Sequence, residues 1–259
     1  MKVVVFLLAL TVSAISQDAR LEKSPRHHEW VKVKAGDRTV ECFVVYPEVK
    51  EKVPVVVVIH ENRGLTDWVR VVADQLAEKG FIAVAPDLLS GIGPEGGRTS
   101  SFPSGDAARE AISKLPAEQV TKDLDSVCTH ATKIAAANGK VAVAGFCWGG
   151  SQTFRFATNR KDLVAAFVFY GSGPDDKEAV ARINCPVYGF YGGNDARVNA
   201  TIPKSEELMK AAGKTYVPVT YEGAGHGFMR AGEDPDASAA NKKARESAWK
   251  RWLELLRKV

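Results

Sequence analysis

The fold of this chain is decided by the stretch Val141-Ala142-Val143-Ala144-Gly145-Phe146-Cys147-Trp148-Gly149-Gly150. Its apolar first half predicts a buried strand, and the segment after it predicts a helix. The glycines leave room for a sharp turn whose central residue, Cys147, adopts a strained backbone conformation. Strand, turn and helix in this order are typical of a nucleophile elbow, with cysteine in the place of serine. The alternative is a buried cysteine in a tight connection, because free cysteine often packs as a small apolar side chain.

Further strands and helices are expected to alternate along the chain. Strands are expected at 29–34, 38–46, 55–60, 81–85, 164–170, 187–191 and 217–221, and helices at 68–79, 107–115, 117–137, 150–159, 203–212 and 236–256. Residues 88–116 are rich in Gly, Ser and Pro, which predicts a surface excursion or a lid. The alternation predicts an α/β fold in three layers, with a mostly parallel sheet between helices, formed by residues 17–259 as a single domain.

Composition narrows the functional classes. The chain has 259 residues, of which 45% are hydrophobic, and this is enough to bury one large core. The formal net charge is +4, and no block of Lys and Arg is long enough to predict a nucleic-acid footprint. We therefore expect no nucleic-acid partner.

The N-terminus predicts export. Lys2 precedes the apolar run 3–12, and small residues follow it, which is the pattern of a secretory signal peptide. Residues 1–16 form the expected signal peptide, with cleavage after Ser16 as the first choice and after Ala14 as the second. The apolar run is too short to span a bilayer comfortably, so we expect a periplasmic or secreted protein without a membrane anchor after cleavage.

Export makes the cysteines informative. The chain has four, Cys42, Cys128, Cys147 and Cys185. If Cys147 stays reduced, three remain, so at least one other cysteine is unpaired as well. The sequence leaves the disulfide state of Cys42, Cys128 and Cys185 open.

A cysteine nucleophile needs a base, and the best candidate is His226. It lies in a glycine-flanked loop directly after the last predicted strand. Because the carboxyl ends of parallel strands form one edge of the sheet, His226 and Cys147 are expected at the same edge. The pair His27-His28 lies in a polar segment, His130 lies within a predicted helix, and His60 ends a central strand, where it lines the site or serves the structure.

The acid that orients this base is expected between Cys147 and His226 in chain order. Asp195 follows the strand 187–191 and reaches the same edge, although an aspartate there can also simply cap a turn. Asp175 and Asp176 compete for the role, but they lie in a run that predicts an exposed turn. We choose Asp195.

The loop His60-Glu61-Asn62-Arg63-Gly64 follows a central strand. It does not match a zinc motif, because position 64 is glycine, so no metal is expected. Instead it lies where the backbone N–H of Asn62 and that of Trp148 can form an oxyanion hole. Glu61 is expected near the sulfur, or else it pairs with Arg63.

With these residues assembled, the chain resembles the dienelactone hydrolase family. The resemblance lies in the elbow 145–150, in His60-Glu61-Asn-Arg-Gly, in Ala85-Pro86-Asp87-Leu88, in Tyr191-Gly192-Gly193-Asn194-Asp195 and in Gly225-His226-Gly227-Phe228. It covers residues 28–257 in the expected order and spacing.

The resemblance implies an α/β-hydrolase fold and a Cys147–Asp195–His226 triad that hydrolyses a small ester or lactone through an acyl-thioester. It implies that Glu61 holds the resting thiol and helps to deprotonate it. It also implies arginines that bind a substrate carboxylate: Arg230 is one, and the other is Arg98 or Arg109. No cofactor is implied, and we expect a monomer.

Two other functional classes remain open at this stage. An acyl-enzyme can also be discharged to an acceptor other than water, as in an acyltransferase or a thiol peptidase. An exported binding protein could keep the pocket without turnover. The presence of a nucleophile, a base, an acid and Glu61 together favours a hydrolase over a binding protein that has lost its activity.

Overall fold

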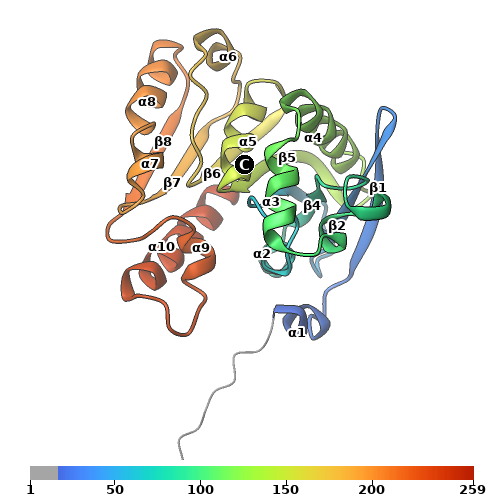
Figure 1. The fold of residues 1–259 in the computed structure, drawn as a ribbon. Helices are drawn as coiled ribbons and strands as arrows, with labels where there is room; N and C mark the ends of the chain where they lie inside the picture. The colour runs from blue at the N-terminus through green and yellow to red at the C-terminus, as the bar shows by residue number, and fades with distance from the viewer. Residues whose placement is uncertain (1–16) are drawn as a thin grey trace, which may run out of the picture.

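A computed structural model describes residues 17–259 and contains one eight-stranded sheet (Figure 1). The predicted signal peptide lies outside the described residues. The strand order is β1-β2-β4-β3-β5-β6-β7-β8; β2 is antiparallel to β1 and β4, and the pairs from β4 to β8 are parallel. This confirms the predicted mostly parallel α/β sheet. The strands are β1 His28–Ala35, β2 Arg38–Val45, β3 Val53–Ile59, β4 Ile82–Asp87, β5 Ala137–Phe146, β6 Leu163–Phe169, β7 Val187–Gly192 and β8 Tyr216–Tyr221.

Helices cover both faces of the sheet, because the central strands bury alternate residues on opposite sides. Val55 and Val57 pack in one core with α4, α5, α6 and α8, whereas Val56 and Val58 pack in a second core with α1, α2, α9 and α10. The helices are α1 Gln17–Glu22, α2 Asp67–Glu78, α3 Gly105–Ser113, α4 Ala117–Ala131, α5 Trp148–Ala157, α6 Lys177–Ala181, α7 Ala196–Asn199, α8 Ile202–Ala211, α9 Phe228–Ala231 and α10 Ala239–Leu256, with 3-10 turns at η1 Pro94–Gly96 and η2 Thr99–Ser101.

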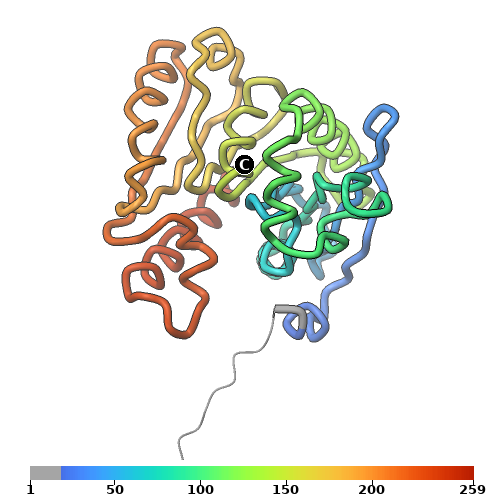
Figure 2. Tube along the Cα trace, viewed as in Figure 1, coloured from blue at the N-terminus to red at the C-terminus, as the bar shows by residue number. Residues whose placement is uncertain are grey.

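The loops at the carboxyl ends of the strands carry the candidate site residues. These loops follow β3, β5, β7 and β8. In the sheet β3 is the neighbour of β5, and β7 is the neighbour of β8. The excursion 88–116 contains α3, which packs on Trp148 through Ala108 and Ile112. In Figure 2 the green trace of this excursion and the red trace of α9 and α10 lie on opposite sides of the view.

Two predicted helix boundaries and one predicted turn differ from the structure. The helix expected at 117–137 ends at Ala131, because residues 132–136 turn into β5 and Gly139, with φ of +85°, belongs to that strand. The turn expected at Asp176 is a helix start, since the Asp176 carboxylate accepts hydrogen bonds from the N–H groups of Glu178 and Ala179. The last helix begins at Ala239 rather than at 236.

The segment before β1 is docked on the domain. Leu21 of α1 is buried. The Arg26 guanidinium donates one hydrogen bond to each carboxylate oxygen of Asp74 in α2, at 2.8 Å from Nε and 2.5 Å from Nη2. No helix of the described chain is long and apolar enough to cross a bilayer.

Candidate active site

Cys147 lies at the apex of the turn between β5 and α5, with φ of +56° and ψ of −115°. This conformation is strained for a residue that is not glycine. The flanking glycines are required by close packing: a Cβ on Gly145 would lie 2.2 Å from the carbonyl oxygen of Gly149, and one on Gly149 would lie 2.3 Å from that of His60. The sharp turn that the sequence predicts is therefore present, and its thiol is partly exposed.

His226 lies between Cys147 and Asp195. Its Nε2 is 3.1 Å from the Cys147 sulfur, and its Nδ1 is 2.5 Å from Oδ2 of Asp195. The other oxygen of Asp195 accepts a hydrogen bond from the N–H of Val198 at 3.4 Å, so the same carboxylate also caps α7. The structure thus brings together the three residues that the sequence predicts for nucleophile, base and orienting acid.

The hydrogen bond to Cys147 is the main cause that raises the pKa of His226 to about 9; burial lowers it, and the bond to Asp195 raises it. At neutral pH the ring is therefore protonated, and both of its N–H groups donate. An imidazole beside a thiol, in turn bound to a carboxylate, is the arrangement of a cysteine nucleophile and its base.

Asn62 and Trp148, the residues expected to supply the N–H groups of an oxyanion hole, both lie beside Cys147. Asn62 follows β3, Trp148 is the first residue of α5, and both line one cavity with Cys147. Within residues 17–259 neither N–H donates to another group. The N-terminus of α5 adds a partial positive charge where an oxyanion would form.

Among the hydrogen bonds and ion pairs of the described residues, Glu61 binds neither the Cys147 thiol, which the resemblance implies it holds, nor Arg63. Its Oε2 accepts a hydrogen bond from Nε of Arg230 at 2.9 Å, and its Oε1 lies 3.5 Å from the hydroxyl of Tyr170. A guanidinium gives a carboxylate a charge-assisted hydrogen bond, which is stronger than one from a thiol. In this structure Arg230 therefore holds Glu61, and His226 holds the thiol.

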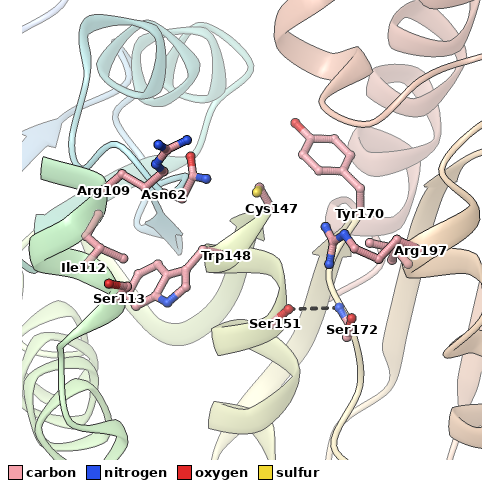
Figure 3. Close-up of a pocket in the computed structure, with 11 residues that line it drawn as sticks. Asn62, Arg109, Ile112, Ser113, Cys147, Trp148, Ser151, Tyr170, Ser172 and Arg197 are labelled. Carbon is pink, nitrogen blue, oxygen red and sulfur yellow. Dashed lines mark hydrogen bonds between the residues drawn. The ribbon is translucent and has the colours of Figure 1, made fainter. Parts of the chain in front are cut away.

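The cavity beside Cys147 has a volume of about 300 Å³. Figure 3 shows Arg109 of α3 and Arg197 of α7 on opposite sides of Cys147. Arg98 lies elsewhere: it forms an ion pair with Glu41 and stacks 3.6 Å from the centre of the Trp30 ring. Of the two arginines left open by the sequence, only Arg109 lines the cavity. The full lining is Asn62, Arg109, Ile112, Ser113, Cys147, Trp148, Ser151, Tyr170, Ser172, Arg197 and Val198.

Two site residues were missed from the sequence, Tyr170 and Arg197. Tyr170 directly follows β6, has φ of +41°, and its ring lies edge-on to His226 with centroids 5.1 Å apart. Its position at the end of a central strand was the available signal. Arg197 lies in a helix of four residues that no periodicity reveals, and its only signal was its place two residues after Asp195.

The other three cysteines are buried and free. Burial raises the pKa of Cys128 to about 12 and that of Cys185 to about 11, and it raises the pKa of Cys42 further. These thiols are thus unreactive compared with a thiol beside an imidazolium. Among residues 17–259 no group of His, Cys, Asp and Glu is arranged to hold a metal ion.

The sequence model of the dienelactone hydrolase family matches residues 40–259, which is most of the chain and all of the site. The chain belongs to the dienelactone hydrolase family. Two relatives named as putative carboxymethylenebutenolidases agree with this assignment. One, from Methylorubrum extorquens, is 31% identical over 209 residues, covering 76% of this chain and 71% of that protein. The other, from Escherichia coli, is 30% identical over 211 residues, covering 78% and 75%.

Solved structures of dienelactone hydrolases share the fold. The crystal structure of a putative dienelactone hydrolase from Klebsiella pneumoniae superposes with a TM-score of 0.77 at 24% identity, covering 90% of this chain and 99% of that one. The α/β-hydrolase fold expected from the resemblance is therefore confirmed.

Proposed function

We propose that this chain hydrolyses carboxylic esters or lactones with Cys147 as nucleophile, His226 as base and Asp195 as the group that orients His226. The observation that carries the proposal is the chain of contacts from the sulfur to Nε2 and from Nδ1 to the carboxylate. A buried structural cysteine has no need of this relay, nor of the strained backbone that exposes its thiol.

The reaction has two halves. The Cys147 sulfur attacks the carbonyl carbon, and the oxyanion accepts hydrogen bonds from the N–H groups of Asn62 and Trp148. The tetrahedral intermediate collapses, the carbon–oxygen bond breaks, and His226 gives its Nε2 proton to the departing alkoxide. Neutral His226 then takes a proton from water, which attacks the thioester and releases the acid, and Cys147 leaves as a thiolate.

We propose further that the substrate carries a carboxylate. The cavity is lined by two arginines, Arg109 and Arg197, and by no acidic side chain. Arg230, which the sequence predicts as a carboxylate ligand, is engaged by Glu61 at 2.9 Å. Arg109 forms a longer ion pair with Asp106, at 3.4 Å, whereas no ion pair of Arg197 occurs among the described residues. Arg197, which lines the cavity together with Arg109, is therefore the arginine with which an anion in the cavity would pair.

The test is turnover of activated esters and of small lactones, dienelactone included, by the protein and by two cysteine variants. Cys147→Ala should reduce turnover to the uncatalysed rate with an unchanged circular dichroism spectrum. Cys185→Ala is the control, because it also removes one free thiol, but one that lies outside the cavity. Turnover that persists in Cys147→Ala would exclude Cys147 as the nucleophile.

The same assay separates hydrolysis from acyl transfer. With an added amine or alcohol, a hydrolase should still release mainly the free acid. A product that contains the acceptor in excess of the acid would favour the acyltransferase alternative.

A further inference from the structure

His60 is completely buried, and both of its ring nitrogens bind backbone groups. Nδ1 is 2.8 Å from the carbonyl oxygen of Glu61, and Nε2 is 3.3 Å from the backbone nitrogen of Leu88. A carbonyl can only accept and an N–H can only donate, so the proton must be on Nδ1 and Nε2 must be bare. Burial, the largest influence, lowers the pKa of His60, which keeps this ring neutral.

The first of these bonds fixes one peptide plane of the predicted oxyanion hole. The carbonyl of Glu61 and the N–H of Asn62 belong to the same planar trans peptide, so they point in opposite directions. When His60 holds the carbonyl on its own side, the N–H of Asn62 must face away from His60. Asn62 lines the cavity that contains Cys147.

His60 also contacts the residue that supplies the second donor. Its ring stacks on the Trp148 indole, with centroids 5.4 Å apart and planes 13° from parallel. The start of α5 packs against the same residue, since a Cβ on Gly149 would lie 2.3 Å from the His60 carbonyl oxygen. One side chain is therefore in contact with both halves of the oxyanion hole.

We propose that His60 is a positioning residue for the oxyanion hole: by holding the carbonyl of Glu61 and stacking on Trp148, it keeps the two N–H donors aimed at one point beside Cys147. The inference rests on the proposed function, because an oxyanion forms only if Cys147 attacks a carbonyl. It assigns His60 no proton transfer and no contact with substrate.

Two amide variants separate the two hydrogen bonds. The amide nitrogen of His60→Asn lies near the place of Nδ1 and can still donate to the carbonyl of Glu61. The longer amide of His60→Gln reaches toward Leu88 and leaves that carbonyl with only the more distant N–H of Gly64, at 3.3 Å. We expect kcat for an activated ester to fall about 100-fold in His60→Gln and less than about 10-fold in His60→Asn, with KM nearly constant in both.

Alkylation of Cys147 by iodoacetamide is the matched control reaction. It needs the thiolate but forms no oxyanion, so its rate should be unchanged in both variants. A purely structural role predicts that hydrolysis and alkylation fall together, in step with the melting temperature. Either that result, or equal kcat in the two variants, would overturn the proposal.

Two further measurements test the positioning role even if the variants do not fold or the protein does not hydrolyse esters. In the wild-type protein, nitrogen-15 NMR of the imidazole should show His60 as the Nδ1–H tautomer, and the Nε2–H tautomer would contradict the positioning role. Affinity for a trifluoromethyl ketone, whose adduct with Cys147 carries an oxyanion, should fall in His60→Gln but not in His60→Asn. Ester turnover that is absent from the wild type would count against the proposed function alone.

Discussion

His226 is the residue whose chemistry depends most on its neighbours. Its pKa is raised to about 9 first of all by the hydrogen bond to Cys147. In the proposed mechanism the sulfur bonds to the carbonyl carbon and so loses its hydrogen bond to His226, and the pKa of His226 should then fall before the alkoxide departs. The ring can therefore act as an acid toward the departing alkoxide and, once neutral, as a base toward water near neutral pH.

The pKa of His226 should therefore depend on Cys147. In the wild type, the imidazole carbon resonances of His226 should titrate with a midpoint of about 9. In Cys147→Ala the midpoint should move down toward the ordinary value of histidine, about 6.5, because the largest raising influence is gone. NMR titration of the two proteins measures this, and equal midpoints would show that the sulfur does not control the base.

Arg197 should select for anionic substrates. In Arg197→Gln we expect KM to rise about 10-fold for a 4-nitrophenyl ester whose acyl chain ends in a carboxylate, because a charge-assisted hydrogen bond is lost. The methyl ester of the same acid is neutral, and its KM should not change. Steady-state kinetics with both esters measures the difference.

Arg98→Gln is the control for this prediction, since Arg98 is bound to Glu41 and does not line the cavity. It should leave both KM values as they are. An equal rise of KM for the charged and the neutral ester in Arg197→Gln would mean that Arg197 shapes the cavity and does not bind an anion.

At the scale of elements, the site is held by close contacts between loops at the carboxyl edge of the sheet. Asp87, at the end of β4, is buried and accepts hydrogen bonds from the backbone N–H and the hydroxyl of Thr99. The Thr99 hydroxyl oxygen in turn accepts from the N–H of Leu65, at 3.0 Å. The excursion after β4 and the loop after β3 are thus joined through one carboxylate.

Gly149→Ala tests how tightly α5 packs on the end of β3. Helix propensity alone predicts a gain in stability of roughly 1 kcal/mol. The added Cβ would instead lie 2.3 Å from the carbonyl oxygen of His60, which is a backbone atom that cannot swing aside. We expect a loss of about 1–3 kcal/mol in the free energy of unfolding, measured by urea denaturation.

Gly225→Ala is the matched control, because its Cβ would meet no atom within 4 Å. It should leave the free energy of unfolding almost unchanged. A Gly149→Ala protein as stable as the wild type would show that α5 is free to shift away from β3.

The long elements could be predicted because burial leaves a periodic pattern. Val55 to Ile59 are apolar without interruption because helices cover both faces of β3, and this pattern is legible without a structure. The helices α6, α7 and α9 have only four or five residues, which is too few for a helical repeat. Arg197 was missed for this reason, because α7, which carries it, is too short to show a helical pattern in the sequence.

For the molecule as a whole, the parallel order of strands made it predictable that Cys147, Asp195 and His226 meet. Residues that follow different parallel strands share one edge, so Cys147, Asp195 and His226 could be assigned from their places after strands. The ion-pair partner of Glu61 could not be predicted from the sequence. Arg230 lies 169 residues away, and whether Glu61 binds it or a nearer arginine depends on the direction in which the Glu61 side chain points. The contacts of His60 were likewise invisible, because they depend on β4 and α5 meeting β3.

We propose that the protein is exported. If residues 1–16 form a signal peptide, expression with its own N-terminus in a secreting bacterial host should yield a protein outside the cytoplasm that begins at Gln17. N-terminal sequencing of each cell fraction measures this. A cytoplasmic product that keeps Met1 would exclude export.

The proposed acyl-thioester on Cys147 can be trapped during the first turnover. The protein is mixed with 4-nitrophenyl acetate, quenched in acid within the first turnover and digested, and the peptides are weighed by mass spectrometry. We predict one acetyl group on the peptide that contains Cys147, and none at this position in Cys147→Ala. Release of 4-nitrophenol with the acetyl group on another residue, or on none, would show that Cys147 is not the nucleophile.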